Sequence, residues 1–398
     1  MKLLFLLNRL VIGGQCSNVI PLAHALSSQQ IQVHLLYGEK ETGEVEPSWL
    51  LKKYPLPIIK KIDSFHRSIN PFNDLHSFLS IYRYIKSYRP DVIHTHGAKC
   101  GLLGRLAAKL AGVPVIVHTF HGHLFHSYYN RFFSYCLVIL ERMLSRITHK
   151  IIATSQPQWQ EFVEVYKIAP AGKVDIIQLG LEEDITGSDE ANPVADCKKE
   201  FPAGCINIGI IARIVEVKNF DLFTRVVESV LQKSLSPIRF FVIGDGSLKM
   251  QTQEKLTVKK ITWCNLPGFV KEAKVIFTSW IADITSTVNE LDLVMLTSLN
   301  EGTGLSLAEA QAAGKPVVAT NVGAIRDTMI DGETGFLVDH FNVEEFAAKL
   351  LLLINNASLR KAMGEKARIF ARRKFSRQRE VEQVKELYYH CLKEKNQG

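Results

Sequence analysis

The chain has 398 residues, which is long for one hydrophobic core and favours two domains. Hydrophobic residues make up 46% and charged residues 22%, a composition that excludes a disordered or fibrous protein. The net charge of +8 is uneven, because residues 1–174 carry 20 Lys and Arg against 10 Asp and Glu, and residues 175–398 carry 28 against 30. The front half therefore either suits an anionic partner, such as phosphate, an acidic membrane surface or nucleic acid, or is an ordinary solvated surface.

The apolar runs and the cysteines disfavour several further classes of protein. No apolar run approaches the roughly 18–20 residues that cross a bilayer, and the run in MKLLFLLNRL is too short for a signal-peptide core. We therefore expect a buried first strand and a cytoplasmic protein. The seven cysteines include no CxxC pair, which disfavours a disulfide framework and a structural zinc site.

The front half alternates predicted strands with predicted helices. Strands are expected at 3–7, 31–37, 92–94, 115–118 and 150–153, and helices at about 17–28, 73–88, 100–112 and 129–147. This alternation predicts a parallel sheet covered by helices on both faces. Residues 183–204 are acidic and rich in Gly and Pro without apolar periodicity, so they are predicted to be a linker.

The alternation restarts after the linker. Strands are expected at 206–212, 239–243, 261–264, 292–296 and 316–319, and helices at 219–232, 247–256, 273–290, 305–313 and 343–355, followed by a basic helix from 365 to 395. The predicted fold class is therefore α/β, with two doubly wound domains. Such folds bind ligands at the carboxyl ends of their strands.

Two glycine pairs follow predicted strands. Gly13 and Gly14 open the first helix, where a helix N-terminus can approach an anion, although a plain turn has the same pattern. The stretch IGDGSLK at 243–249 has Lys249 where a dinucleotide fingerprint needs its third glycine. A nicotinamide cofactor is therefore disfavoured.

Two cations follow the first strand of the back half. Arg213 and Lys218 lie in ARIVEVKN, five positions apart. A bidentate guanidinium and an ammonium point charge form a phosphate clamp that needs no metal, whereas the alternative is two surface cations.

Histidines are concentrated in the front half, with 11 of 13 before residue 150. Those in IHTHG at 93–97 and HTFHGHLFH at 118–126 fall at or just past predicted strand ends. A zinc site is disfavoured because no i, i+4 pair with a nearby acid occurs. We expect instead that one or two of these histidines touch a substrate.

Residues 300–309, NEGTGLSLAE, join a strand to a helix. Gly302 and Gly304 free the backbone, so N–H groups near Ser306 can point at one anion beside the helix N-terminus. Glu301 and Glu309 can then flank that anion and accept hydrogen bonds from hydroxyls on either side. The alternative is an exposed loop charge and a favourable acid near a helix start.

Together these stretches resemble glycosyltransferase family 4, the retaining, nucleotide-sugar-dependent enzymes of the GT-B fold. The resemblance runs in order through IGG (12–14), RPDVIHTHG (89–97), TFHG (119–122), ARIVEVKN (212–219), VIGDGSLK (242–249), LPGFV (266–270), EGTGLSLAE (301–309) and GKPVVATNVGAIRDTMIDGETGFLV (314–338). It implies two Rossmann-like domains facing across a cleft. The expected domains are residues 1–185 for the acceptor and 204–375 for the nucleotide sugar, with 376–398 a helix that packs back on the first domain.

The resemblance also implies roles for individual residues. Glu309 would bind the ribose, Glu301 the donor sugar hydroxyls, and the Val270 backbone the nucleobase. The residues implied for the diphosphate are Arg213, Lys218, Gly304, Leu305 and Ser306, with Gly14 lying against it from the other domain. His121 would approach the reacting sugar from that domain. The chain departs from many relatives at Asn219, where Gly is common, and at Thr303, where Phe is common. The change at Thr303 is expected to alter the shape of the space around the donor sugar.

The implied reaction moves a sugar from a nucleotide-diphosphate sugar, with UDP favoured, to a glycan or lipid-linked acceptor in cell-surface polysaccharide or lipopolysaccharide synthesis. No metal or other cofactor is expected, and retention would follow from front-face displacement. Residues 123–146 mix aromatic, apolar and Arg residues, so they either dip into a membrane interface or pack within their own domain. The alternatives are a nucleotide-sugar epimerase of the same fold and, less favoured, a nucleic-acid-binding protein or an inactive scaffold.

Overall fold

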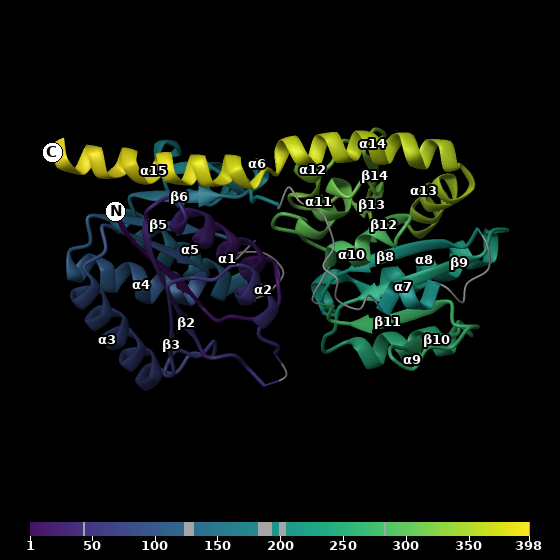
Figure 1. Ribbon diagram of the computed structural model, residues 1–398, viewed down its shortest axis with the longest axis horizontal. Coiled ribbons are helices and arrows are strands. Elements are labelled where there is room, and N and C mark those ends of the chain that lie inside the picture. Colours follow the sequence, from purple (N-terminus) through teal and green to yellow (C-terminus); the bar gives the residue numbers. More distant parts are fainter. Residues whose placement is uncertain (43, 123–130, 182–192, 199–203, 282–283, 398) are drawn as a thin grey trace. The chain divides into compact units, whose positions relative to one another are not determined.

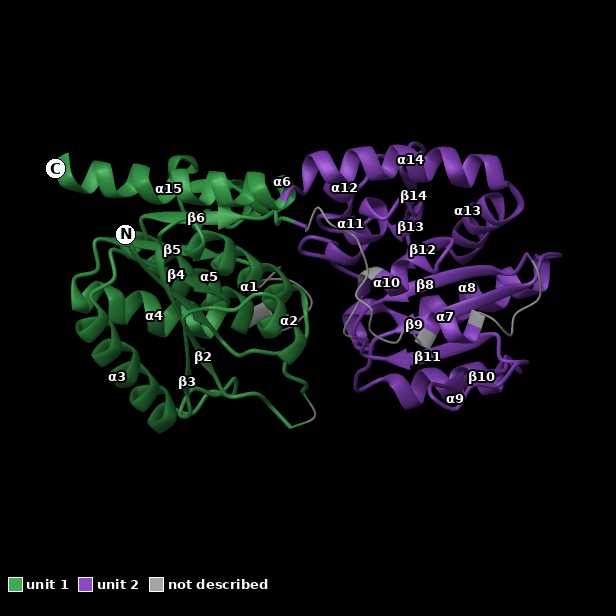
Figure 2. Ribbon diagram, in the orientation of Figure 1, with its two compact units in different colours: residues 1–180, 377–398 green, residues 181–376 purple. Residues whose placement is uncertain are grey.

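The computed structural model describes residues 1–42, 44–122, 131–181, 193–198, 204–281 and 284–397 (Figure 1). The chain divides into two compact units (Figure 2). Unit 1 comprises Met1–Gly180 together with Arg377–Gly398, and unit 2 comprises Leu181–Ser376. The predicted fold class is confirmed, because each unit contains a seven-stranded, wholly parallel sheet with helices packed on it.

The sheet of unit 1 reverses its strand order beside β1. Its strands, in spatial order, are β3 (Ile58–Ile62), β2 (Gln32–Gly38), β1 (Lys2–Leu7), β4 (Val92–His96), β5 (Val115–Thr119), β6 (Lys150–Ala153) and β7 (Val174–Ile176). The central strands β1, β4 and β5 are almost entirely buried, as expected for a parallel sheet covered on both faces. The switch point, where a doubly wound sheet binds ligands, therefore lies between the carboxyl ends of β1 and β4.

Seven α-helices among the described residues accompany this sheet: α1 (Gly14–Ser27), α2 (Ser48–Lys53), α3 (Pro71–Tyr88), α4 (Ala98–Ala111), α5 (Arg131–Ile147), α6 (Gln156–Gln160) and α15 (Arg377–Gln397). Local sequence explains their limits. Asn70 caps α3 by accepting hydrogen bonds from the N–H groups of Phe72 and Asn73, with Pro71 at the first helical position, and Arg89 ends it in a left-handed conformation.

Unit 2 repeats the arrangement with its switch point between β8 and β12. Its strands, in spatial order, are β10 (Trp263–Asn265), β11 (Val275–Ser279), β9 (Ile238–Ile243), β8 (Ile206–Ile211), β12 (Leu293–Leu296), β13 (Val317–Thr320) and β14 (Gly335–Val338). Its helices are α7 (Pro193–Lys198), α8 (Phe220–Lys233), α9 (Lys249–Val258), α10 (Ile284–Asn289), α11 (Leu305–Ala312), α12 (Ile325–Thr328), α13 (Val343–Asn355) and α14 (Ala357–Lys374). One large hydrophobic core joins these layers.

The helix predicted over 273–290 is wrong. Residues 275–279 form strand β11 between β10 and β9, and of the described residues in this range those from 284 to 289 are helical. The run Val275–Ser279 is β-branched and aromatic, and its first four residues are fully buried. A strand covered on both faces has no polar alternation, so periodicity alone cannot separate it from a buried helix.

The basic C-terminal stretch is helical, as predicted, and consists of two helices. Helix α14 ends at Lys374, and α15 begins at Arg377 as part of unit 1. Helix α15 packs on α1, where Asn18 donates from its side-chain amide to Glu380 at 2.7 Å and accepts from Arg377 through its carbonyl at 3.2 Å. Gly180, at the end of the first stretch of unit 1, lies against the Arg377 backbone so closely that a Cβ would clash.

Two predictions fall partly outside the described residues. Most of the predicted linker, 183–204, lies in 182–192 and 199–203, whereas its residues 193–198 form α7. The first part of the proposed membrane segment, residues 123–130, is likewise outside them. Among the helices that the structure describes, none has the length and apolar character needed to cross a bilayer.

Candidate active site

Most of the predicted site residues lie at the switch point of the unit 2 sheet, between β8 and β12. Arg213 and Lys218 follow β8, and Glu301 follows β12, the strand next to β8 in the sheet. Parallel strands end at the same sheet edge, so segments far apart in sequence meet there. The bond from the Leu299 N–H to the Val217 carbonyl, 2.8 Å long, joins the two loops directly.

Lys218 and Glu301 form an ion pair across this switch point. The Lys218 ammonium donates to Oε1 of Glu301, and both side chains are mostly buried, with 19% and 10% of their surfaces exposed. The Ser298 hydroxyl donates to the same carboxylate oxygen at 2.6 Å. The pair is therefore held in a partly desolvated place, where charge-assisted hydrogen bonds are strong.

Two further hydroxyls, at the ends of β12 and β13, bond backbone carbonyls of these loops. Thr297 donates to the Lys218 carbonyl at 2.9 Å, and Thr320 donates to the Ser298 carbonyl at 2.7 Å. Ser298 and Thr297 are fully buried. Sequence reasoning missed both residues, although their place just after the predicted strand 292–296 and three or four residues before Glu301 was a usable signal.

The loop between β12 and α11 is built by glycines. Gly304 has φ of 58°, the left-handed conformation that glycine adopts without strain, and it precedes the first residue of α11. Gly323 lies so close to the Glu301 backbone that a Cβ would be 2.3 Å from the Glu301 carbonyl oxygen. The N–H of Ala324 donates to that carbonyl at 2.9 Å, and this hydrogen bond holds the loop at Glu301 in place.

The N-terminus of α11 offers backbone donors beside this loop. The N–H groups of Gly304, Leu305 and Ser306 have no acceptor within the helix, because the first turn of any α-helix leaves its donors unpaired. Thr328 donates to the Thr303 carbonyl at 2.8 Å and so holds the turn in place. Together with the helix dipole, these donors make an anion site of the kind that binds phosphate.

Glu309 lies one turn into α11 without a charged partner among the described residues. Burial raises the pKa of this carboxyl from 4.5 to about 7. A carboxyl in this state is available to hydrogen-bond a ligand, since no described side chain consumes its oxygens. Within the described part of the chain, no hydrogen bond or ion pair is formed by the Glu309 carboxyl.

Arg213 and Val270 are exposed to solvent. Arg213 is exposed just after β8, and its guanidinium has no partner among the described side chains. Val270 follows the edge strand β10, which is separated from β8 by β11 and β9, and it is 46% exposed. The structure therefore brings Arg213, Lys218, Glu301 and the α11 N-terminus to one switch point and leaves Val270 further along the same sheet edge.

The remaining predicted residues, Gly14 and His121, lie at the carboxyl edge of the unit 1 sheet. Gly14 is the first residue of α1, and the position of a Cβ on the preceding Gly13 is open. His121 follows β5, and its Nε2 is 2.9 Å from Nδ1 of His96 at the end of β4. Burial lowers the pKa of His121 to about 4, so its ring is neutral near pH 7.

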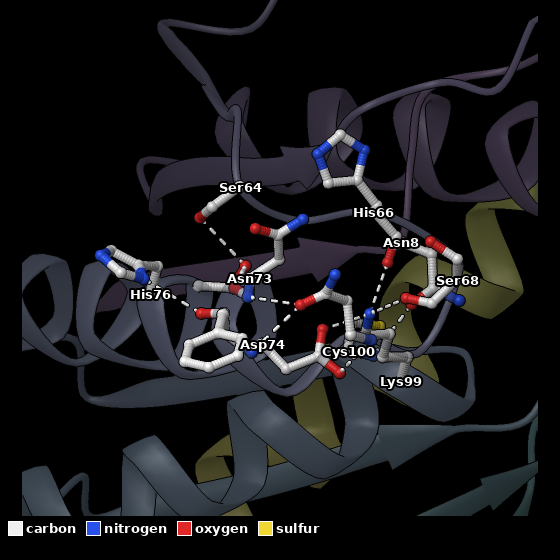
Figure 3. A network of polar contacts seen from close by, with 12 residues as sticks. Asn8, Ser64, His66, Ser68, Asn73, Asp74, His76, Lys99 and Cys100 are labelled. Atoms are coloured by element: carbon white, nitrogen blue, oxygen red, sulfur yellow. Dashed lines mark hydrogen bonds and ion pairs between the residues drawn. The ribbon is translucent and has the colours of Figure 1, made fainter.

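A polar network fastens the loop after β3 to this edge (Figure 3). The Lys99 ammonium donates to the carbonyls of His66 and Ser68 at 2.7 and 2.6 Å and forms an ion pair with Asp74. The Cys100 N–H donates to the Asn8 side chain at 2.8 Å, which ties the end of β1 to the start of α4. These contacts use up the Lys99 donors, so Lys99 organises the edge and is not free for a ligand.

Metal ligation is not visible in these side chains. Among the described residues, no group of three or more His, Cys, Asp or Glu side chains could hold a metal ion. In the front-half histidine cluster, His96 and His121 are hydrogen-bonded to each other, and His118 is hydrogen-bonded to Thr95 at 2.8 Å.

Two family models match the chain. The model described as "Glycosyltransferase Family 4" matches residues 12–184, and the one described as "Glycosyl transferases group 1" matches residues 198–370. The chain is 27% identical over 330 residues to the UDP-Gal:alpha-D-GlcNAc-diphosphoundecaprenol alpha-1,3-galactosyltransferase of Escherichia coli, covering 81% of each chain. It is 25% identical over 347 residues to the capsular polysaccharide biosynthesis glycosyltransferase CapM of Staphylococcus aureus, covering 86% of this chain and 88% of CapM.

Solved structures show the same fold at lower identity. Anabaena Alr3699/HepE in complex with UDP superimposes with a TM-score of 0.76 at 19% identity, covering 98% of this chain and all of that chain. The two family matches cover the two sheets and the loops described above. Both relatives are named as glycosyltransferases, and the chain aligns with most of the length of each. The chain belongs to glycosyltransferase family 4 and is an enzyme of the glycosyltransferase class.

Proposed function

We propose that this enzyme transfers a hexose from a UDP-sugar to a lipid-linked or polysaccharide acceptor during cell-surface polysaccharide synthesis. The observation that carries the proposal is the Lys218–Glu301–Ser298 cluster beside the unpaired donors of α11. It combines a cation and backbone N–H groups for a diphosphate with a carboxylate for sugar hydroxyls. The name of the E. coli relative favours UDP and a lipid-linked acceptor, and the name of the S. aureus relative favours capsular polysaccharide synthesis.

In this proposal the donor lies along the carboxyl edge of the unit 2 sheet. Glu309 binds the ribose hydroxyls, and Arg213, Lys218 and the N–H groups of Gly304, Leu305 and Ser306 bind the diphosphate. Glu301 accepts hydrogen bonds from the sugar, and the Val270 backbone contacts the base. The cations and N–H groups stabilise the charge that develops on the leaving diphosphate, so no metal is assigned to the reaction.

The bond changes give retention. The acceptor oxygen forms its bond to the anomeric carbon on the face from which UDP leaves, while the bond from that carbon to the diphosphate oxygen breaks. The leaving phosphate oxygen takes the acceptor proton, so no enzymic nucleophile is required. His121 and Gly14 are the unit 1 residues assigned to the donor sugar and the diphosphate, and unit 1 is assigned to the acceptor.

Product analysis tests this reaction directly. Purified enzyme is incubated with a panel of UDP-, GDP- and ADP-sugars and an undecaprenyl-diphosphate-linked sugar, with and without EDTA. We expect an α-linked product from an α-linked UDP-sugar, formed equally well with EDTA. A β-linked product would overturn retention, loss of transfer in EDTA would overturn the metal-free reaction, and an epimerised donor without acceptor would favour the epimerase.

We further propose that unit 1 docks on an anionic membrane surface through α3, α4 and α5. Helix α4 packs against both α3 and α5. Large apolar side chains are exposed on all three helices, at Phe72 and Leu75 on α3, Leu106 and Leu110 on α4, and Tyr135, Ile139 and Met143 on α5. The last three are spaced by four residues and therefore share one face of α5.

The charges of these helices fit anionic lipid. The three helices contain eight Lys and Arg residues against two acids, Asp74 and Glu141. Both acids are consumed in ion pairs, Asp74 with Lys99 and Glu141 with the fully buried Arg105. The other basic residues therefore have no unpaired acid beside them on the same helices. Each basic residue near an anionic lipid surface contributes about 1 kcal/mol to the free energy of binding.

Vesicle flotation tests the membrane surface. We expect the protein to float with vesicles that contain phosphatidylglycerol and to stay behind with pure phosphatidylcholine. The double variant Ile139→Asp/Met143→Asp should lose binding, while Ile369→Asp, which alters a still more exposed apolar residue on α14 of unit 2, should not. Equal flotation of the double variant and wild type would exclude this surface.

A further inference from the structure

The two cations at the unit 2 switch point differ in how their charge is compensated in the ligand-free protein. The Lys218 ammonium is paired with the Glu301 carboxylate, and both side chains are mostly buried. Arg213, five residues earlier in the same loop, is exposed and forms no ion pair with the described side chains. The three side chains together carry a net charge of +1, which would be +2 without Glu301.

Glu301 is held beside Lys218 by the protein itself. Its Oε1 accepts hydrogen bonds from both the Lys218 ammonium and the Ser298 hydroxyl. The backbone on each side of the pair is fixed as well. The Ala324 N–H donates to the Glu301 carbonyl at 2.9 Å. The Thr297 hydroxyl donates to the Lys218 carbonyl, also at 2.9 Å. The carboxylate is therefore a built-in anion next to a cation that is proposed to bind diphosphate.

A diphosphate that uses Lys218 meets this carboxylate in one of two ways. An ammonium has three N–H donors, so Lys218 can bind both anions at once. The phosphate and the carboxylate then lie within about 6 Å of each other, since each is about 2.8 Å from the same nitrogen. Alternatively, Lys218 turns to the phosphate and no longer compensates the charge of Glu301. Both arrangements cost free energy, because like charges repel and a desolvated carboxylate needs its cation.

A sugar attached to the diphosphate offsets this cost. A carboxylate has about four lone-pair sites, so Glu301 can accept from sugar hydroxyls while it keeps its bonds to Lys218 and Ser298. Hydrogen bonds to an ionised carboxylate are roughly twice as strong as those between neutral groups. Bare UDP has no sugar hydroxyl at this end of its diphosphate, so the cost to UDP is not offset.

We propose that Glu301 is a specificity-determining residue that makes the enzyme bind a UDP-sugar in preference to its product, UDP. The negative charge beside Lys218 weakens the binding of UDP, and hydrogen bonds to the sugar restore the affinity for the donor. The sugar contacts rest on the proposed sugar transfer, whereas the effect of the charge on UDP does not require transfer. Loss of the sugar to the acceptor then removes the favourable contact, which promotes release of UDP.

Isothermal titration calorimetry of the full chain with UDP tests the effect of the charge. Glu301→Gln keeps the size of the side chain and removes its charge, so it should bind UDP about tenfold more tightly than wild type. Glu216→Gln is the matched control, because it removes the same charge from an exposed residue two positions before Lys218. Ser298→Ala keeps the charge and removes the 2.6 Å hydrogen bond. Both controls should bind UDP within about twofold of wild type.

Each other result of the titration decides against the proposal. Unchanged or weaker UDP binding by Glu301→Gln would mean that Glu301 orients Lys218 for the phosphate and does not oppose it. Equal tightening by Glu216→Gln would reduce the effect to the general field of the protein, and equal tightening by Ser298→Ala would reduce it to a loosened loop. Absence of UDP binding by wild type and Glu301→Gln alike would refute the proposed nucleotide site, and this role with it.

A second titration, without acceptor, uses the UDP-sugar that wild type turns over. Glu301→Gln should bind this donor no more tightly than wild type, because it loses the charge-assisted bonds to the sugar. The preference for the UDP-sugar over UDP should therefore fall by about tenfold or more. An unchanged preference would overturn the role in specificity. Tighter UDP binding by Glu301→Gln in an enzyme that transfers no sugar from any UDP-sugar would instead refute the proposed function and leave the charge effect standing.

Discussion

The two units use the same sheet to present opposite chemistry. In both, the strand order reverses beside the first strand, and the loops that follow the strands on either side of the reversal meet. Unit 2 places a charged pair and helix N–H groups there, whereas unit 1 places neutral imidazoles and amides such as Asn8 and Gln15. The backbone decides where a site forms, and the few residues after each strand decide what it binds.

Burial shifts the pKa of one group at each edge, in opposite directions. It raises the pKa of Glu309 in unit 2 to about 7 and lowers that of His121 in unit 1 to about 4. Each shift favours the neutral form of its group. Their contributions to stability nevertheless change with pH in opposite directions.

The largest expected effect is at the charged edge of unit 2. Glu301→Ala should lower kcat/KM by about 10²–10³-fold, because it removes the carboxylate assigned to the donor sugar and leaves Lys218 unpaired. Radiolabelled sugar transfer measures the loss, and circular dichroism checks the fold. Lys218→Ala combined with Glu301→Ala should cost less than the sum of the two, and wild-type turnover by Glu301→Ala would refute the site assignment.

Glu309 should make unit 2 less stable as the pH rises. Its folded pKa of about 7 lies above its ordinary 4.5, so its contribution is fully present below about pH 4.5 and is lost as the pH rises through 7. The shift corresponds to at most about 3 kcal/mol. Glu309→Gln should match wild type at pH 5 and exceed it at pH 8, measured by hydrogen exchange of β12 and β13 amides. An unchanged difference between the two pH values would rule out the raised pKa.

His121 should make unit 1 less stable as the pH falls. Its folded pKa of about 4 lies below its ordinary 6.5, so its contribution is present above about pH 6.5 and is lost as the pH falls through 4. The upper limit is again about 3 kcal/mol. Compared with wild type, His121→Asn should flatten the loss of protection of the β4 and β5 amides between pH 7 and 5. Identical pH profiles for the two proteins would speak against this assignment.

Ser298 should have a smaller effect that is confined to the orientation of Glu301. Ser298→Ala removes a 2.6 Å hydrogen bond to the carboxylate and should lower kcat/KM by about tenfold, equivalent to about 1.4 kcal/mol. Thr297→Val, which removes the neighbouring bond to the Lys218 carbonyl, serves as the matched control. If both variants lose activity equally, the Ser298 hydroxyl has no special role.

The smallest effect is expected at Tyr388. Tyr388→Phe keeps the buried ring but removes the hydrogen bond to His94, which should lower the free energy of unfolding of unit 1 by about 1 kcal/mol. Thermal unfolding measures the shift, and Tyr389→Phe, on the exposed neighbour, is the control. A melting temperature unchanged from wild type would mean that the Tyr388 hydroxyl contributes nothing to the seating of α15.

The strands and helices that the sequence predicted well are those with a clear local pattern. Strands such as β1 and β8 are apolar runs bounded by polar residues, and α3 carries its own cap in Asn70 and Pro71. Strand β3 was missed because its sequence, IIKKI, is half exposed and contains two lysines. Strand β14, GFLV, was also missed.

By itself, the sequence determined the fold class, the two-domain organisation and the motif that places Arg213, Lys218, Glu301 and Glu309 at strand and helix ends, since these follow from local patterns. Only the tertiary structure decided which side chains meet. Lys218 and Glu301 are 83 residues apart, His96 and His121 are 25 apart, and His94 and Tyr388 are 294 apart. Such contacts depend on the order of strands in the sheet and the packing of α15, which no local pattern of residues records.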